Sequence, residues 1–419
     1  MKKVLLLCHF SNEELRSHID QAPLKRANSI RRLLKRPDVP NVDAAPWVPT
    51  FVEGIRKFGK DVELHVVTSC VGMKYPRQDY MIGGVKYHIF NYDLPWLYKL
   101  CDKIFNITQQ THYRIYRKRI SAIIRDVHPE LIVLSGAENP EYSSAVLDHL
   151  NIPSFVILQT LLSSPKRIKL NVGTPYRRKM EQEIFTKCSF FTASEDGADA
   201  IIKRLNPSAV CFDFEFSTLP PPIFTDIEKE YDFVFVSGAL TKFKGVEDTI
   251  RAFGLFCKDY PHSTLDIIGF AREDYLTILY DIVKESDVEG KVFFEGRYPD
   301  KDDMFKQVQK ARIMVVPGIT ATLNTTVREG MFMGMPVLQY ETSVCKKINK
   351  EKPCLAVAKM EDISDLADQM KLLYENPVTS KQMADNGQEY ANRHFTSEAV
   401  GKKLANQIEQ VFKIIDKNE

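Results

Sequence analysis

The sequence predicts an α/β protein with two domains, each built on a doubly wound sheet of mainly parallel strands. The chain has 419 residues, which is more than one ordinary hydrophobic core accommodates. Short apolar runs of strand length alternate with stretches of helical periodicity, as parallel sheets require. A Leu-Pro-Pro-Pro run at residues 219–222 predicts a hinge between a domain over residues 1–216 and a domain over residues 217–396.

Composition excludes several classes of protein. The chain is 44% hydrophobic and 27% charged, which is typical of a soluble globular protein, and no apolar run approaches the roughly 18 residues of a membrane span. The opening MKKVLLLCHF predicts a first strand rather than a signal peptide. The eight cysteines are scattered without a CxxC pair, which argues against a metal site or a disulfide framework and predicts free thiols in the cytoplasm.

Charge is divided unevenly along the chain, although the formal net charge is only +2. Residues 1–220 contain 31 Lys and Arg against 23 Asp and Glu, a balance of +8, which leaves −6 for the rest. A basic first half indicates an anionic partner, such as a membrane surface, whereas ordinary solvated faces would explain the same split.

The first domain is expected to open with a strand at residues 4–9. No GxGxxG follows this strand, so dinucleotide binding has no support. A basic insertion at residues 16–41 is expected to be a long charged loop, and a helix at residues 46–58 is expected to end at Gly59. Apolar runs predict the other strands of the domain at residues 62–68, 85–90, 131–134, 154–158 and 190–193.

Further basic stretches follow in the same domain. Residues 94–127 interleave apolar and basic side chains and are expected to form one long helix or two. Such a helix either lies on an anionic membrane or packs one face and solvates the other. Residues 166–169 and 177–179 are expected to form a basic loop. Ser194 is expected to cap a helix at residues 195–205.

The second domain continues the alternation, with a helix expected at residues 246–256. Its strands are expected at residues 231–236, 265–269, 292–295 and 313–316. The closing helix, residues 397–417, is expected to be amphipathic. Its apolar face consists of Val400, Leu404, Ile408, Val411, Phe412 and Ile415.

Residues 311–340, ARIMVVPGITATLNTTVREGMFMGMPVLQY, carry the strongest signal of a site. They predict a strand, a small polar loop and a short helix at about residues 324–333 that Gly334 stops. Unpaired amide N–H groups and the positive dipole end at the start of such a helix attract anions. Three residues add amide or hydroxyl groups at this tip: Asn324, Thr325 and Thr326.

Glu329 lies one turn inside the expected helix, and helical side chains lean back toward the N-terminus. Its carboxylate could therefore accept hydrogen bonds from the hydroxyls of a sugar whose phosphate binds the helix tip. The alternative is a strand–loop–helix unit that binds nothing, with Glu329 as an exposed helix charge.

Residues 237–245, SGALTKFKG, are the second informative stretch. A small-residue turn at Gly238 lets a ligand approach the backbone, and a lysine provides a point charge for phosphate. Lys242 and Lys244 are the candidates, and the alternative is that both are solvated loop charges.

These two stretches resemble the donor site of glycosyltransferase family four. Residues 329–337, EGMFMGMPV, are similar to the second half of the family's motif, and Lys244-Gly245 is similar to its Lys-Gly pair. The sequence departs from the family at Ala239, where the family has Arg, and at Ala321, where it has a first Glu that contacts the donor sugar.

The resemblance also implies roles for other residues. Arg297 and Tyr298 stand where relatives hold the base, although a surface Arg-Tyr pair is equally consistent. Gln159 stands where the family has a catalytic-site His, and a Gln binds sugar hydroxyls but transfers no proton at neutral pH. Glu138 and Asn139 are expected to face the same cleft.

The fold that the resemblance implies is GT-B, two Rossmann-like domains facing each other across a cleft. Residues 1–216, completed by the helix at 397–419, would form the N-terminal acceptor-side domain, and residues 217–396 would form the C-terminal nucleotide-sugar-binding domain. The implied activity is sugar transfer from a UDP or GDP donor to a glycan or lipid-linked acceptor, with retention, in cell-surface polysaccharide synthesis. The alternative is a GT-B relative that binds nucleotide or glycan without turnover.

Within that activity, Lys244, Glu329 and Gln159 are the expected catalytic residues. The donor is expected to contact Gly238, Lys242, Arg297, Tyr298, Asn324, Thr325 and Thr326. No metal or other cofactor and no nucleic-acid partner are expected. The location is expected to be cytoplasmic, with peripheral contact at the anionic inner face of the membrane.

Overall fold

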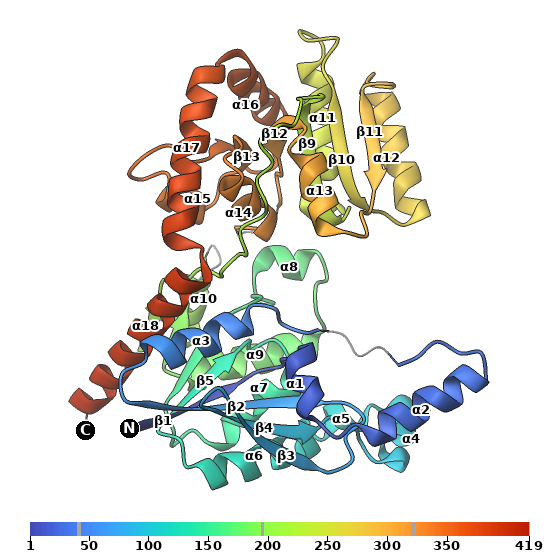
Figure 1. The fold of residues 1–419 in the computed structure, drawn as a ribbon. Coiled ribbons are helices and arrows are strands. Elements are labelled where there is room, and N and C mark those ends of the chain that lie inside the picture. The colour runs from blue at the N-terminus through green and yellow to red at the C-terminus, as the bar shows by residue number, and fades with distance from the viewer. Residues whose placement is uncertain (40–42, 194–196, 320–322, 419) are drawn as a thin grey trace. The chain divides into compact units, whose positions relative to one another are not determined.

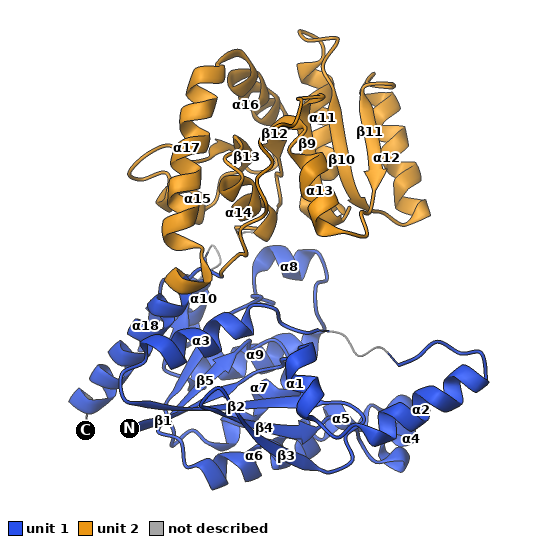
Figure 2. Ribbon diagram, viewed as in Figure 1, with its two compact units in different colours: residues 1–216, 400–419 blue, residues 217–399 orange. Residues whose placement is uncertain are grey.

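The computed structural model describes residues 1–39, 43–193, 197–319 and 323–418. The chain divides into two compact units (Figure 2). Unit 1 consists of Met1–Phe216 with Val400–Glu419, and unit 2 consists of Ser217–Ala399. The chain passes from unit 2 back into unit 1 within the closing helix α18 (Ser397–Asn418), shown in red in Figure 1.

The described part of unit 1 contains an eight-stranded sheet in the order β3-β4-β2-β1-β5-β6-β7-β8. Neighbouring strands are parallel except β3 and β4, which are antiparallel. The strand order reverses at β1, so the loops after β1 and β5 meet at a topological switch point, where sheets of this kind bind ligands. The strands are β1 (Lys2–Leu7), β2 (Val62–Cys70), β3 (Arg77–Ile82), β4 (Val85–Asn91), β5 (Leu131–Ser135), β6 (Ser154–Ile157), β7 (Phe190–Thr192) and β8 (Val210–Phe212).

Alternate side chains of β1 enter two separate cores, because successive side chains of a strand point to opposite faces. Val4 and Leu6 face the layer formed by α3 and α18. Leu5 and Leu7 face the layer formed by α6, α7, α9 and α10. The helices of these layers are α3 (Val48–Phe58), α6 (Arg114–Val127), α7 (Pro140–Ser143), α9 (Pro175–Lys187) and α10 (Ala198–Leu205). The 3-10 helix η1 (Ser144–Asp148) follows α7.

The amphipathic closing helix is confirmed, because its apolar face is buried against α3 and β1 in unit 1. The two helices cross where Gly54 meets Gly401. A Cβ at residue 54 would lie 2.3 Å from the Cα of Gly401, so larger residues would separate them. The buried residues of this face are Val400, Leu404, Ile408, Val411 and Phe412.

The described part of unit 2 contains a six-stranded parallel sheet in the order β11-β10-β9-β12-β13-β14. The order reverses at β9, which places a second topological switch point between β9 and β12. The strands are β9 (Tyr231–Ala239), β10 (Leu265–Phe270), β11 (Val292–Gly296), β12 (Ala311–Val315), β13 (Val337–Tyr340) and β14 (Ala356–Ala358). The predicted α/β class with two mainly parallel sheets is therefore confirmed.

Two helices of unit 2 were predicted and are present. The helix expected at residues 246–256 is α11 (Val246–Phe256), and the short helix expected at about residues 324–333 is α14 (Thr325–Phe332). Gly334, with φ +64°, ends α14 as expected. The other helices of the unit are η2 (Lys242–Lys244), α12 (Glu273–Glu285), α13 (Lys301–Val308), α15 (Ser343–Ile348), α16 (Ile363–Glu375) and α17 (Pro377–His394).

The prediction of a long charged loop at residues 16–41 is wrong. This insertion contains the end of α1 (Glu13–His18) and all of α2 (Ala22–Leu33). Leu24 is the only buried residue of α2, so core packing contributes little to this helix. Alanine, leucine and arginine, which favour helices intrinsically, form it instead.

The basic loop expected at residues 166–169 and 177–179 is also wrong, because these residues lie in α8 (Pro165–Lys169) and α9. Each helix begins with a proline, and the side chain of Thr174 caps α9, signals that the basic residues obscured. Residues 94–127 form three helices rather than one or two, broken where Asn106 and Tyr113 have positive φ. The additional helices are α4 (Trp96–Phe105) and α5 (Ile107–Gln110).

The capping role expected of Ser194 concerns a residue outside the described ranges. The helix expected at residues 195–205 is described as α10 from Ala198, after Gly197, and the first two residues of that prediction also lie outside the described ranges. In the part of the chain that the structure describes, no helix combines the length and the apolar character needed to cross a membrane.

Candidate active site

The switch point of unit 2 brings together the two loops that the sequence singled out. The loop after β9 contains η2 and Gly245, and the loop after β12 leads into α14. The N–H of Ile319 donates to the carbonyl of Phe243 at 3.0 Å. Gly245 has φ +84°, and a Cβ there would lie 2.1 Å from the carbonyl oxygen of Pro317, so only glycine allows this approach.

The residues after β9 offer exposed positive charge and open backbone. Lys242 and Lys244 lie in η2, and both side chains are exposed. Gly238, near the end of β9, is exposed, and no described atom lies within 4 Å of the position that its Cβ would take. A ligand can therefore approach the main chain at Gly238 closely while a lysine provides positive charge nearby.

The tip of α14 has the features of an anion site. Asn324 occupies the N-cap position, but its side chain accepts no capping hydrogen bond. Its amide nitrogen instead lies 2.7 Å from the position of a Cβ on Gly318. Among the residues that the structure describes, the side chain at the N-cap position therefore leaves the N–H groups of the first turn uncapped. The side chains of Thr325 and Thr326 are solvent-accessible at this end. Ala321, which replaces the family's first Glu, lies outside the described residues.

Glu329 follows one turn later on α14 and is partly buried. Burial raises the pKa of its carboxyl group, and the positive charges of Lys301 and Arg328 oppose this effect. The next residue, Gly330, packs so tightly that a Cβ would lie 2.7 Å from the sulfur of Met314. This contact holds α14 against β12. Because the carboxylate of Glu329 is partly desolvated and held at a fixed position, it is suited to accept hydrogen bonds from ligand hydroxyls.

Arg328 is a residue that the sequence interpretation missed. It is buried, and its guanidinium donates to Thr218 Oγ1 at 2.8 Å and to Thr325 Oγ1 at 3.2 Å. The same group lies 5.9 Å from the centre of the Phe395 ring. Arg328 thereby ties the first turn of α14 to the segment that enters unit 2. The sequence feature that could have identified Arg328 is its spacing of three residues from Thr325, which places both side chains on one face of the helix.

Arg297 and Tyr298 follow β11, which β10 separates from β9. Arg297 is exposed, and the hydroxyl of Tyr298 donates to Glu295 at 3.1 Å, so Tyr298 is engaged within its own segment. No hydrogen bond or ion pair among the described residues links either residue to Lys244 or to Glu329.

Gln159 lies in unit 1, after β6, and its amide donates to Ser135 Oγ at 2.7 Å. Glu138 and Asn139 follow β5 on the neighbouring strand. Arg177 holds this pair by donating to the Glu138 carbonyl and to Asn139 Oδ1, both at 2.8 Å. The polar residues Gln159, Glu138 and Asn139 therefore lie at the carboxyl ends of two neighbouring strands, β5 and β6.

A cavity of about 190 Å³ opens at the switch point of unit 1, and the sequence interpretation did not identify its histidine. His9 follows β1, and Nδ1 of its ring lies 3.3 Å from Ser69 Oγ. Partial burial lowers the pKa of His9, and Glu141 opposes the shift. The position of His9 directly after the first strand was the available signal. The lining consists of His9, Ser69, Phe90, Tyr92, Asn139, Glu141 and Tyr142.

Comparison with known proteins finds sequence similarity over part of the chain. Residues 223–390 match the family model described as glycosyl transferases group 1. An uncharacterized glycosyltransferase of Haemophilus influenzae is 26% identical over 149 residues, which span 35% of this chain and 41% of that relative.

Solved structures extend the likeness over the whole chain. Sucrose-phosphate synthase from Thermosynechococcus elongatus has a TM-score of 0.66 at 13% identity, with all of both chains covered. The E. coli trehalose-6-phosphate synthase structure bound with UDP-2-fluoro glucose has a TM-score of 0.65 at 8% identity over 98% of this chain and 99% of that one. Anabaena HepE in complex with UDP and glucose has a TM-score of 0.56 at 13% identity over 98% and 100%. At these identities the likeness establishes the fold, GT-B.

Proposed function

We propose that this chain, whose residues 223–390 form a domain of the glycosyl transferases group 1 family, transfers a sugar from a UDP- or GDP-linked donor to a glycan or lipid-linked acceptor. The observation that carries the proposal is the junction of the Lys244-Gly245 turn and the start of α14 at the switch point of unit 2. The complexes of related GT-B structures with UDP and UDP-2-fluoro glucose support a nucleotide-sugar donor.

In the proposed site, the donor diphosphate lies against the uncapped amides of α14, with Lys244 opposite. Departure of the nucleotide diphosphate develops negative charge, which a lysine and oriented N–H groups stabilise without reorganisation. Glu329 accepts hydrogen bonds from the ribose. We propose that this charge stabilisation and the positioning of donor and acceptor act without a metal ion, and that the sugar is transferred with retention.

The acceptor is proposed to bind unit 1, where the cavity beside His9 presents a ring nitrogen, a carboxylate and aromatic side chains. Aromatic walls with a few polar groups suit a sugar ring with hydroxyls at its edge. Cell-surface polysaccharide synthesis would supply such acceptors.

Membrane contact is also proposed, through a surface formed by α2 and α4. Helix α4 has no buried residue, and five of its large apolar side chains are more than half exposed. They are Trp96, Leu97, Leu100, Ile104 and Phe105. An exposed apolar face of this kind marks an interaction surface.

Helix α2 provides the charge for the same surface. Leu24 of α2 lies against Gly72, whose N–H donates to Asp93, and Asp93 in turn accepts from Lys99 of α4 at 2.6 Å. Figure 1 shows both helices at the same end of unit 1. Apolar side chains beside basic ones suit a cytoplasmic protein that binds the anionic inner face of a membrane. The basic residues in and directly after α2 are Lys25, Arg26, Arg31, Arg32, Lys35 and Arg36.

The test of the proposed activity is nucleotide release from a panel of UDP- and GDP-sugars, with acceptor extract and with or without EDTA. Release of one nucleotide, unchanged by EDTA, is the expected result. Binding of nucleotide without release from any donor would favour the alternative, a protein that binds nucleotide or glycan without turnover. That alternative is kept because Gln159, bound to Ser135, cannot transfer protons as a His would.

A further inference from the structure

Unit 2 contains a larger cavity, of about 440 Å³, that the proposed activity does not use. It lies where β12 begins and α14 ends, whereas the proposed donor site lies where β12 ends and α14 begins. The eight residues of α14 span about 12 Å, so the two sites are distinct. The end of α16, the start of α17 and the segment before β9 complete the walls.

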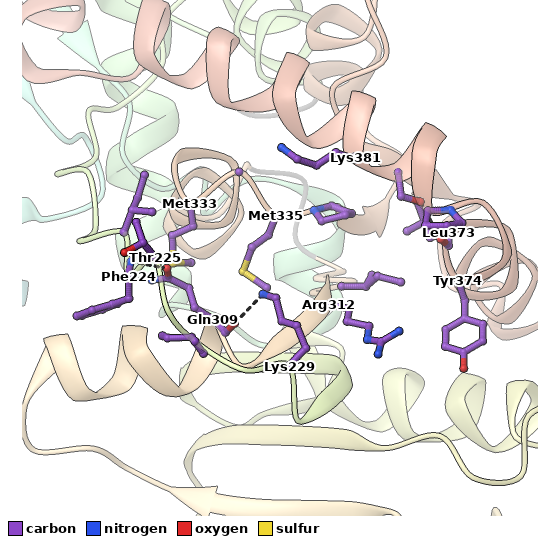
Figure 3. Close-up of a pocket in the computed structure, with 17 residues that line it drawn as sticks. Phe224, Thr225, Lys229, Gln309, Arg312, Met333, Met335, Leu373, Tyr374 and Lys381 are labelled. Carbon is purple, nitrogen blue, oxygen red and sulfur yellow. Dashed lines mark hydrogen bonds between the residues drawn. The ribbon is translucent and has the colours of Figure 1, made fainter.

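The described lining of this cavity contains three basic side chains and no carboxylate. Lys229 comes from the segment before β9, Arg312 from β12 and Lys381 from α17, and Figure 3 shows all three around the same space. Three separate segments therefore contribute positive charge to one cavity.

The three basic side chains differ in their partners within the unit: Arg312 and Lys381 each lie near a carboxylate, whereas Lys229 bonds backbone carbonyls. The ammonium of Lys229 donates to the carbonyls of Gln309 at 2.7 Å and Ala311 at 2.9 Å, which are neutral partners. Arg312 lies 3.8 Å from Asp232, at the limit of an ion pair, and its side chain is 60% exposed. Lys381 pairs with Asp385 one turn further along α17. An anion would thus meet only neutral carbonyls at Lys229 and a distant carboxylate at Arg312, and it would share Lys381 with Asp385.

The N-terminus of α17 adds a fourth favourable contribution. This helix of 18 residues begins at Pro377, and Asn376 makes no side-chain cap to its first turn. The uncapped end, with its positive dipole, faces the cavity through Pro377 and Ser380.

The rest of the lining is apolar. Met333 and Met335 follow α14, and Leu373 and Tyr374 come from the last turn of α16. In Figure 3 the two methionine side chains lie between Phe224 and the basic residues. Methionine adapts its shape to different apolar groups, so this wall can accommodate an apolar body of moderate size.

We propose that this cavity, the α14-end site, binds a small organic anion whose acidic group contacts Lys229, Arg312 and Lys381 and whose apolar body contacts the methionines. A volume of 440 Å³ is in the range of small-molecule sites. An inorganic anion would leave the apolar wall unused, and a neutral apolar molecule would leave the basic residues unused.

The test uses the full chain and anilinonaphthalene sulfonate, an aromatic anion whose fluorescence rises in apolar surroundings. We expect one saturable site that decanoate displaces and that inorganic phosphate and UDP do not. The double variant Arg312→Gln/Lys381→Gln should weaken the dye at least tenfold. Both residues are solvent-accessible, so the fold should tolerate the change, which circular dichroism checks.

Lys229→Gln is a second, independent variant, and it should also weaken binding of the dye. Arg272→Gln/Lys284→Gln, two exposed basic residues of unit 2 outside the cavity, is the matched control and should leave dye affinity unchanged. Equal affinity in the wild type and the Arg312→Gln/Lys381→Gln variant would overturn the proposal. Displacement by phosphate or by UDP would overturn it too, because the dye would then occupy a plain anion site or the nucleotide site.

Discussion

Gly245 approaches Pro317 so closely that a Cβ on residue 245 would lie 2.1 Å from the Pro317 carbonyl oxygen. This contact joins the two loops at the switch point of unit 2. It explains why a Lys-Gly pair and a strand–loop–helix segment, about 70 residues apart in the sequence, serve one site.

Gly245→Ala should destabilise unit 2 by about 2–4 kcal/mol, through a left-handed φ and the clash with Pro317. Thermal unfolding measures this as a lower melting temperature. Gly238→Ala is the matched control, because φ is not left-handed there and no described atom lies within 4 Å of the added Cβ. Equal melting temperatures for the two variants would show that the loops do not depend on their close approach.

Glu329→Gln should weaken nucleotide binding by about 1.5–3 kcal/mol, the cost of losing a charged hydrogen bond. Calorimetry with UDP and GDP would record a roughly tenfold to hundredfold rise in Kd. Glu289→Gln, at an exposed carboxylate of the same unit, should leave Kd unchanged. If Glu329→Gln also leaves it unchanged, Glu329 does not contact the nucleotide.

Asp266→Asn should alter the pH dependence of stability. Burial, together with the charge of Glu295, raises the pKa of Asp266 from 3.8 to about 7, although Gln307 donates to it at 3.0 Å. The pKa of Asp266 is higher in the folded protein than in the unfolded chain. Its ionisation therefore leaves the free energy of unfolding undiminished below pH 3.8 and lowers it as the pH rises to about 7.

The Asn variant lacks this loss, so it should be more stable than the wild type at pH 8, by up to about 4 kcal/mol, and similar to it at low pH. Denaturant titration of both proteins across this range is the measurement. Asp281→Asn, at an exposed position, should follow the wild-type curve. A wild-type stability that does not fall between the two pKa values would contradict the burial of an ionisable Asp266.

Leu100→Glu/Ile104→Glu should reduce binding to vesicles of phosphatidylglycerol and phosphatidylcholine at least tenfold, because it places charge on the apolar face of α4. Co-sedimentation measures the loss, and added salt should weaken wild-type binding by screening the basic residues of α2. Leu372→Glu/Val378→Glu changes two exposed apolar residues of unit 2 and should have no effect. Wild-type binding that is insensitive to salt would exclude the α2 and α4 surface as the contact.

Much of the fold could be predicted because buried strands and amphipathic helices leave periodic patterns. The helix at residues 246–256 and the face of α18 that contains Leu404 and Ile408 were predicted on this basis. Helix α2 was not predicted, and in the structure it buries only Leu24. The segment that matches the glycosyl transferases group 1 model, residues 223–390, contains Lys244-Gly245 and residues 329–337, on which the resemblance rests.

The candidate site was predictable only in part, for a physical reason. Local patterns identify a helix tip or a glycine turn, but they do not show which side chains other segments bring to it. Arg328 binds Thr218, which lies 110 residues earlier, and His9 shares a cavity with Asn139, which follows a different strand. Such partners depend on strand order, which the sequence pattern leaves open.

The most direct test of the central claim is a crystal structure of the full chain soaked with UDP or GDP. The proposed function predicts diphosphate oxygens within hydrogen-bonding distance of the main-chain amides of Thr325 and Thr326 and of Lys244 Nζ. Nucleotide bound elsewhere in unit 2, with Lys244 directed away from the diphosphate, would contradict it.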